Sequence, residues 1–269
     1  MWCGLNNNYL RKADKFKSIY DLYQQLTEHL CDRLEYTVIT PKNILIMESR
    51  FDIDYSLIRS RYPQANIYQI NTLRGYLGQV AALKLVNKIF SPNAAKQYKL
   101  VAKLDNIPLP SEMFDLIIAP FALSFYPNYV DVLKEIRRLL KKNATFFLSG
   151  LGVDSFKELR EYGLSVAKYP DIHDIGDELI RLNFSNPVLD REEITLSYPN
   201  IQIAADEIRI FANGFVNHAN IIARDKYNNI INNKQQQKIT LEIYSAHAWR
   251  DNLGFELDNG TKTINFERK

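Results

Sequence analysis

Short apolar runs alternate with segments of helical periodicity between residues 43 and 150, and this alternation constrains the fold more than any other feature. The run FDLIIA at 114–119 is apolar apart from one aspartate, which predicts a strand buried on both faces of a sheet. Strands separated by helices pair in parallel through crossover connections, so a mostly parallel sheet with helices on both faces is expected. The other strands predicted in this half are 43–48, 65–71, 98–102 and 144–150.

The segments before and between these runs are predicted to be helices. In the first of them, Leu22, Leu26, Leu30 and Leu34 recur every four residues, as they would on one face of a helix. The predicted helices of this half span 9–36, 53–61, 73–90 and 128–141.

After residue 150 the pattern changes, and two predicted helices at 154–164 and 174–183 are followed by three apolar runs. One run contains ITLEIY at 239–244, which alternates inward and outward residues as antiparallel edge strands do. The strands predicted here span 192–198, 207–214 and 238–249.

The 269 residues are enough for one large domain with a well-buried core. Five parallel strands followed by antiparallel ones predict an α/β fold with a Rossmann-like, seven-stranded sheet, although the pattern alone also allows other doubly wound folds. We predict a single domain of four parts: an N-terminal helical segment (1–40), a Rossmann-like core (41–150), a helical cap (151–192) and C-terminal antiparallel strands (193–269).

Composition narrows the classes of function. A net charge of +3 is far from the clustered basic excess of a nucleic-acid-binding protein. Cys3 and Cys31 are the two cysteines, and neither belongs to a CxxC pair, so no metal site or disulfide framework is expected. No apolar run approaches the ~20 residues of a membrane helix. The sequence therefore predicts a soluble, cytoplasmic protein that binds neither nucleic acid nor membrane.

Several stretches resemble the class I S-adenosylmethionine-dependent methyltransferases. IPLPSEMFDLIIAPFALSFYPN (107–128) is similar to the fourth-strand region of that family, and LKEIRRLLKKNATFFLSGLGVDSFKELR (133–160) to the following helix and strand. DIHDIGDELIRLNFSNPVLDREEITLSYP (171–199) more specifically resembles the malonyl-acyl-carrier-protein O-methyltransferases of biotin synthesis and their relatives, which include mitochondrial complex I assembly factors. HLCDRLEYTVITPKNIL (29–45) and LEIYSAHAW (241–249) resemble the same subfamily, so the likeness covers nearly the whole chain.

The resemblance implies transfer of a methyl group from S-adenosylmethionine to the free carboxylate of a malonyl thioester on acyl carrier protein. That carboxylate is already a nucleophile, so the enzyme needs to orient it rather than deprotonate it. No catalytic side chain is assigned. Acyl carrier protein is acidic, which implies a basic docking face. Basic residues that could attract it are Arg11, Lys12, Lys15 and Lys17, although a solvated helix face explains them equally.

The resemblance also assigns cofactor positions, and this chain departs from the family at most of them. The family's first strand runs into a DLGxGxG turn whose glycines let the backbone approach the cofactor. Here the acidic position is Ile46, and the three glycine positions are Glu48, Arg50 and Asp52. The remaining positions are Asn71 at the ribose, Lys103 and Leu104 at the adenine, and Ala119 after the fourth strand.

These departures keep two functions open. Charged side chains at 48, 50 and 52 would occupy space that the family leaves free, and the Lys103 ammonium offers donors only. One function is a divergent methyltransferase. The other is a non-catalytic protein of the same fold that binds a carrier protein or another partner.

Three residues are candidates for the substrate side: Tyr20, His173 and Trp249. Each also has a structural explanation. His173 lies where Asp171 or Asp174 would cap a helix. Tyr20 could belong to the core, and Trp249 could pack at the edge of the sheet. No group of His, Cys and Asp has metal-ligand spacing, and Ser124 and Ser149 lack an obvious histidine partner.

Overall fold

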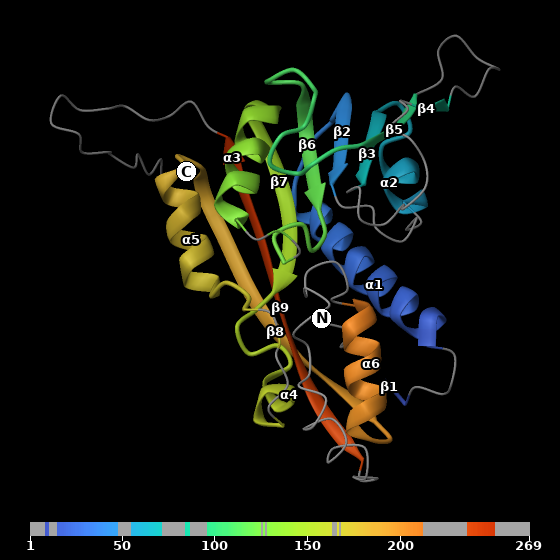
Figure 1. Ribbon diagram of the computed structural model, residues 1–269. Coiled ribbons are helices and arrows are strands. Elements are labelled where there is room, and N and C mark those ends of the chain that lie inside the picture. Colours follow the sequence, from blue (N-terminus) through green and yellow to red (C-terminus); the bar gives the residue numbers. More distant parts are fainter. Residues whose placement is uncertain are drawn as a thin grey trace, which may run out of the picture.

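The computed structural model describes residues 9–10, 15–47, 55–71, 84–86, 96–124, 126, 128–162, 166, 168–211 and 236–250 (Figure 1). The strands are β1 (Tyr9–Leu10), β2 (Asn43–Met47), β3 (Asn66–Asn71), β4 (Lys84–Val86), β5 (Gln97–Val101), β6 (Phe114–Ala119), β7 (Leu140–Leu151), β8 (Ser185–Tyr198) and β9 (Gln237–Arg250). The helices are α1 (Lys15–Asp32), the 3₁₀ helix η1 (Arg33–Tyr36), α2 (Ser56–Arg61), α3 (Tyr129–Leu139), α4 (Lys157–Glu161), α5 (Ile172–Arg181) and α6 (Ile201–Phe211).

All described strands form one sheet, in the order β1-β8-β9-β7-β6-β2-β3-β5-β4. Strands β5, β3, β2, β6 and β7 are parallel, as the alternation of strands and helices predicts. β9 lies antiparallel between β7 and β8 (Figure 1). The predicted Rossmann-like sheet of seven strands is therefore confirmed, and two short strands, β1 and β4, extend its edges.

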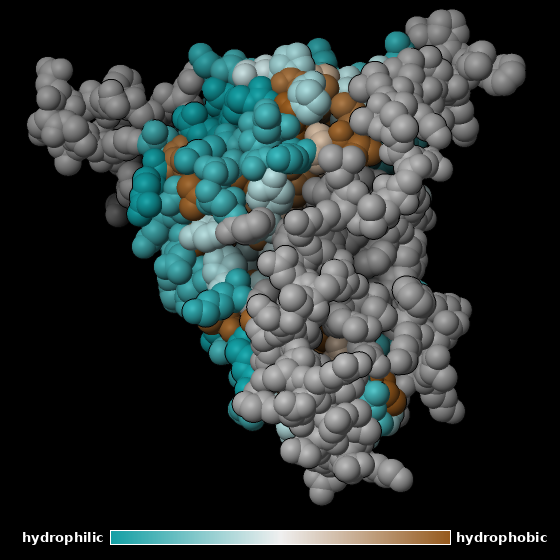
Figure 2. Space-filling view, in the orientation of Figure 1, coloured by the Kyte–Doolittle hydropathy of each residue, from teal (hydrophilic) through white to brown (hydrophobic). Residues whose placement is uncertain are grey.

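Alternate residues of the central strands enter two apolar clusters on opposite faces of the sheet. Ile44 and Ile46 of β2 pack with α1, α2, α4 and α6, whereas Leu45 and Met47 pack with α3 and α5. This period of two is the pattern expected of strands buried on both faces. The outer sides of α3 and α5 are largely hydrophilic in Figure 2. Among the described residues, no helix is both long and apolar enough to span a membrane.

Four parts of the expected layout are wrong. Tyr9 and Leu10, predicted to begin the first helix, form β1 instead. The helix predicted at 73–90 contains strand β4 at 84–86, and its other residues lie outside the described ones. β4 pairs with β5, whose backbone groups would otherwise be unpaired at that edge. Residues 207–211 belong to α6 rather than to a strand, because Ile201, Ala204 and Ile208 form a buried stripe at helical spacing. The strand predicted at 192–198 begins earlier, because β8 starts at Ser185 and pairs along β9.

The reactivity of Cys31 in α1 tests whether the apolar cluster around that helix is buried. Its side chain is 8% exposed, and burial, with the nearby carboxylates of Asp32 and Glu28, raises the thiol pKa from 9.0 to about 12. In a Cys3→Ser background, Cys31 should react with a maleimide at about pH 8 only after denaturation, because the thiolate is the reactive form. Because folding raises the pKa of Cys31, the protonated thiol stabilises the folded state fully below pH 9.0. This stabilisation decreases progressively as the pH rises to about 12. Rapid labelling of the native protein would place Cys31 outside the core.

Candidate cofactor and substrate site

The strand order reverses at β2, and this reversal locates the candidate site. From β2 the sheet continues to β3 and β5 on one side, whereas the chain then returns to β6 on the other side. Ligands of open parallel sheets bind outside the carboxyl ends of the strands at such a switch point. The expected crevice therefore lies beyond Met47 of β2 and Ala119 of β6.

Helix α1 covers the carboxyl end of β6 (Figure 1). The Tyr23 hydroxyl donates to the Pro120 carbonyl oxygen at 3.1 Å, just after β6. The Tyr23 ring also packs against Phe121, with ring centroids 5.1 Å apart. Both side chains are 0% exposed. The turn after β6 is thus buried beneath α1 by aromatic side chains.

Phe121 has a left-handed backbone, with φ of 55°. This conformation costs a bulky residue about 1–2 kcal/mol and persists where the surroundings impose it. Two serines supply part of that constraint: Ser149 Oγ accepts the Phe121 N–H at 3.3 Å, and Ser124 Oγ accepts the Leu151 N–H at 2.6 Å. The serines therefore fasten the ends of β6 and β7 to each other.

A polar cavity of about 490 Å³ lies beside the carboxyl end of β5. Lys103 is exposed at its edge, whereas the neighbouring Leu104 is fully buried. Glu135 and Arg138 of α3 hold the following loop, since the Ile107 N–H donates to Glu135 Oε1 at 2.7 Å. The cavity is lined by Lys103, Asp105, Asn106, Asp131, Lys134, Glu135 and Arg138.

The structure describes only some of the predicted cofactor positions. Glu48, Arg50 and Asp52 lie outside the described residues. Asn71 ends β3 opposite Val101, and its side chain is likewise outside what is described. These positions remain predictions.

The remaining cofactor positions are described, and their roles stay predictions. Lys103 has only donors to offer an adenine amino group, which is itself a donor. Leu104 and Ala119 are buried and apolar, and the carbonyl oxygen after Ala119 is bonded to Tyr23.

The structure does not bring the three substrate candidates together. Tyr20 lies in α1 and His173 in α5, and these helices pack on opposite faces of the sheet. The His173 N–H donates to Asp171 Oδ1 at 2.8 Å, so Asp171 is the helix cap and the His173 side chain is exposed. Trp249 pairs with Thr145 in the middle of β7, level with Leu116 rather than with Ala119 at the carboxyl end of β6.

The basic residues suggested for docking are also only partly visible. Arg11 and Lys12 lie outside the described residues, and Lys15 and Lys17 begin α1 with side chains that are not described. Their role in docking stays a prediction.

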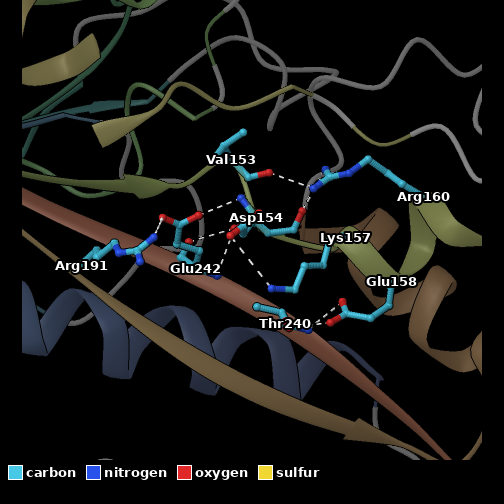
Figure 3. A network of polar contacts seen from close by, with 9 residues as sticks. Val153, Asp154, Lys157, Glu158, Arg160, Arg191, Thr240 and Glu242 are labelled. Atoms are coloured by element: carbon cyan, nitrogen blue, oxygen red, sulfur yellow. Dashed lines mark hydrogen bonds and ion pairs between the residues drawn. The ribbon is translucent and has the colours of Figure 1, made fainter. Parts of the chain in front are cut away.

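Glu242 of β9 anchors the loop that follows β7 (Figure 3). Its carboxylate is 2% exposed, accepts the Asp154 N–H at 2.7 Å and lies 3.3 Å from Arg191. Ser155 Oγ donates to the Glu242 carbonyl oxygen at 2.8 Å. These contacts hold the loop against β9 beyond Leu151, where β7 ends and β9 would otherwise have an open edge.

Sequence reasoning missed both Tyr23 and Glu242. Tyr23 carries no local signal, because its partner Pro120 is 97 positions away in the sequence. Glu242 had a local signal, because it is a charged residue within the buried strand run LEIY. A buried carboxylate requires partners, so its position alone predicts a polar network.

Comparisons with known proteins agree with the fold described above. A family model described as a methyltransferase domain matches residues 66–148. The malonyl-acyl-carrier-protein O-methyltransferase of Methylovorus sp. is 25% identical, over 95% of this chain and 93% of its own. The enzyme of the same name from Laribacter hongkongensis is 26% identical, over 94% and 93%. A mitochondrial arginine-hydroxylase of Rattus norvegicus is 23% identical, over 72% and 67%.

Solved structures show the same fold. Phosphoethanolamine N-methyltransferase 2 of Haemonchus contortus, in complex with phosphomonomethylethanolamine and S-adenosylhomocysteine, has a TM-score of 0.54 at 10% identity, and the match covers 90% of this chain and 59% of that one. A methyltransferase-like protein of Bacillus halodurans has a TM-score of 0.52 at 10% identity, with 83% and 99% covered. This chain therefore has the class I methyltransferase fold and is similar, along most of its length, to the malonyl-acyl-carrier-protein O-methyltransferases.

Proposed function

We propose that this protein is an O-methyltransferase that esterifies the free carboxylate of malonyl-acyl carrier protein, a step toward the pimeloyl part of biotin. The observation that carries the proposal is the similarity to malonyl-acyl-carrier-protein O-methyltransferases over 95% of the chain, including the cap. Within this part of the chain, Asp171 caps α5 and β8 continues into the sheet. S-adenosylmethionine would be the methyl donor, as in the family.

The proposed acceptor does not require a strong base among the residues at the strand ends. A malonyl carboxylate is anionic at neutral pH, so the reaction requires orientation and exclusion of water rather than a strong base. Ser124 and Ser149, the hydroxyl side chains at the ends of β6 and β7, accept backbone hydrogen bonds and thus serve the structure of the site.

A second candidate function is a non-catalytic protein of this fold that binds a carrier protein. The contact of Tyr23 with Pro120 favours it, because that contact occupies the β6 side of the expected crevice. The exposed ammonium of Lys103 favours it as well, since adenine recognition in the family uses an acceptor at that position.

Methyl transfer distinguishes the two functions. Purified protein should convert malonyl-acyl carrier protein and S-adenosylmethionine to the methyl ester, detected by mass spectrometry of the carrier protein. Acetyl-acyl carrier protein, which lacks the free carboxylate, is the matched control and should remain unmodified. Absence of ester, together with no heat on calorimetric titration with millimolar S-adenosylmethionine, would leave only the binding role.

The pathway is tested separately in cells. Expression of this chain should restore growth without biotin to a bacterial strain that lacks its own malonyl-acyl-carrier-protein O-methyltransferase. A purified protein that forms the ester while the strain still requires biotin would point to a different acceptor in the cell.

A further inference from the structure

His247 of β9 lies beside the ion pair that joins η1 to β8. Arg33 Nη1 of η1 lies 2.6 Å from Asp190 Oδ2 of β8, and the two side chains are 24% and 42% exposed. His247 pairs with Phe147 of β7 on one side and with Val188 of β8 on the other, two residues before Asp190. Side chains two residues apart on a strand share a face, so Asp190 is a diagonal neighbour of His247. The imidazole therefore has one cation and one anion close to it.

The surroundings of His247 favour its neutral form. Its ring stacks on the ring of Phe147, with centroids 5.1 Å apart and planes inclined by 18°. Phe147 is buried and belongs to the apolar cluster on this face of the sheet. Among the described residues, the charged groups that act on His247 are Arg33 from η1 and Asp190 from β8, whereas β7 presents the neutral Phe147. Burial and the Arg33 guanidinium lower the pKa of His247, and the Asp190 carboxylate offsets them only in part.

The ion pair of Arg33 with Asp190 fastens η1 to the antiparallel part of the sheet. On its other side, η1 is held through the carbonyl oxygen of Leu34, which accepts the Thr37 N–H at 3.2 Å and Arg61 Nη2 at 2.8 Å. Helix α1 is anchored separately, because its own apolar residues enter the core cluster. A change at the ion pair therefore acts on η1 and leaves α1 in place.

We propose that His247 is a pH-sensitive switch that controls the attachment of η1 to β8. Neutral His247 leaves the ion pair of Arg33 with Asp190 intact. A proton on the imidazole places a second cation beside Arg33 and a competitor for the Asp190 carboxylate, so the ion pair weakens and η1 is held less firmly. This inference concerns the fold at acidic pH and does not depend on the proposed methyl transfer.

The first test is the pH dependence of stability. Because folding lowers the pKa of His247, the folded protein binds fewer protons than the unfolded chain below about pH 6.5, so stability falls as the pH decreases through that value. Between pH 7.5 and pH 5.5, the unfolding equilibrium constant from urea denaturation should rise about three- to tenfold more for wild type than for His247→Phe. The new phenyl ring can still stack on Phe147 but binds no proton. Equal rises for the two proteins would overturn the switch.

His173→Phe is the matched control, because it makes the same change in an exposed side chain at the start of α5. It should keep the pH dependence of the wild type. If it removes as much of that dependence as His247→Phe does, the dependence is not specific to the position of His247, and the switch is wrong.

Hydrogen exchange measures the local effect on η1. The Thr37 amide reports on this helix, because its N–H donates to Leu34. After correction for the intrinsic exchange rate, its protection in the wild type should fall severalfold from pH 7.5 to pH 5.5, whereas in His247→Phe it should stay constant. Protection in the wild type that is the same at both pH values would contradict the proposal.

Arg33→Gln provides a further measurement that does not require the His247 variant to fold. The substitution removes the cation that opposes protonation and keeps the Asp190 carboxylate, so the pKa of His247 should rise. Titration of the imidazole signals by nuclear magnetic resonance follows this directly. A midpoint that does not move to higher pH would show that Arg33 and His247 are not coupled, which would also overturn the switch.

Discussion

Gly150→Ala is expected to destabilise the protein by about 3 kcal/mol or more, the upper range for overpacking a core. A Cβ at Gly150 would lie 2.2 Å from Cζ and from the hydroxyl oxygen of Tyr244, which is fully buried on the paired strand β9. Neither strand can move aside, because both lie within the sheet. Urea denaturation followed by circular dichroism measures the change in the free energy of unfolding.

Two further variants show whether the clash is the cause. Tyr244→Leu combined with Gly150→Ala should recover much of the lost stability, because the shorter side chain leaves room for the new methyl group. Gly176→Ala in α5 is the matched control, since its Cβ would meet only a Leu189 methyl group at 3.7 Å. It should stabilise the protein by about 0.5–1 kcal/mol through helix propensity. Equal losses for Gly150→Ala and Gly176→Ala would contradict the steric explanation.

Glu242→Ala has the second largest expected effect, a loss of about 3 kcal/mol in the free energy of unfolding. The variant removes a buried carboxylate, leaves the Asp154 N–H without its acceptor and opens space against Gly152, where a Cβ would lie 2.3 Å from Glu242 Cδ. The loop after β7 should then detach from β9 first. Hydrogen exchange at 154–156 and urea denaturation together measure the local and global effects.

The size of this loss depends on the backbone contacts more than on the ion pair. Arg191, the partner of Glu242, is 55% exposed, so solvent screens their attraction and Arg191→Ala should cost less than about 1 kcal/mol. Glu193 stands opposite Glu242 on β8 and is exposed, so Glu193→Ala should change stability by less than about 0.5 kcal/mol. A loss with Arg191→Ala as large as with Glu242→Ala would show that the charge pair dominates.

The sequence predicted the central sheet well because its strands are marked locally. FDLIIA at 114–119 became β6 with the same bounds, since a run that is apolar on both faces is stable only between two layers of helices. β4 was missed because a three-residue strand exists only by pairing with β5. α6 was missed because EIRIF was interpreted by its composition, while the helical spacing that begins at Ile201 decided the outcome.

The candidate site was less predictable, for a physical reason. The family resemblance assigned positions such as Lys103, which lies at the edge of a polar cavity at the end of β5. The burial of the turn after β6 depends on a contact between α1 and that turn, and no local pattern encodes a contact across 97 residues. The charged residues predicted at 48, 50 and 52 lie outside the described residues and stay predictions.

The position of β9 has a consequence for biosynthesis. β9 follows both of its neighbours in the sequence, yet it lies between them in the sheet. β7 and β8 therefore cannot pair with β9 while residues 237–250 are still inside the ribosome. Until then the nascent chain presents two unpaired strand edges, the kind of surface that invites intermolecular pairing. Products truncated before residue 237 are therefore expected to aggregate.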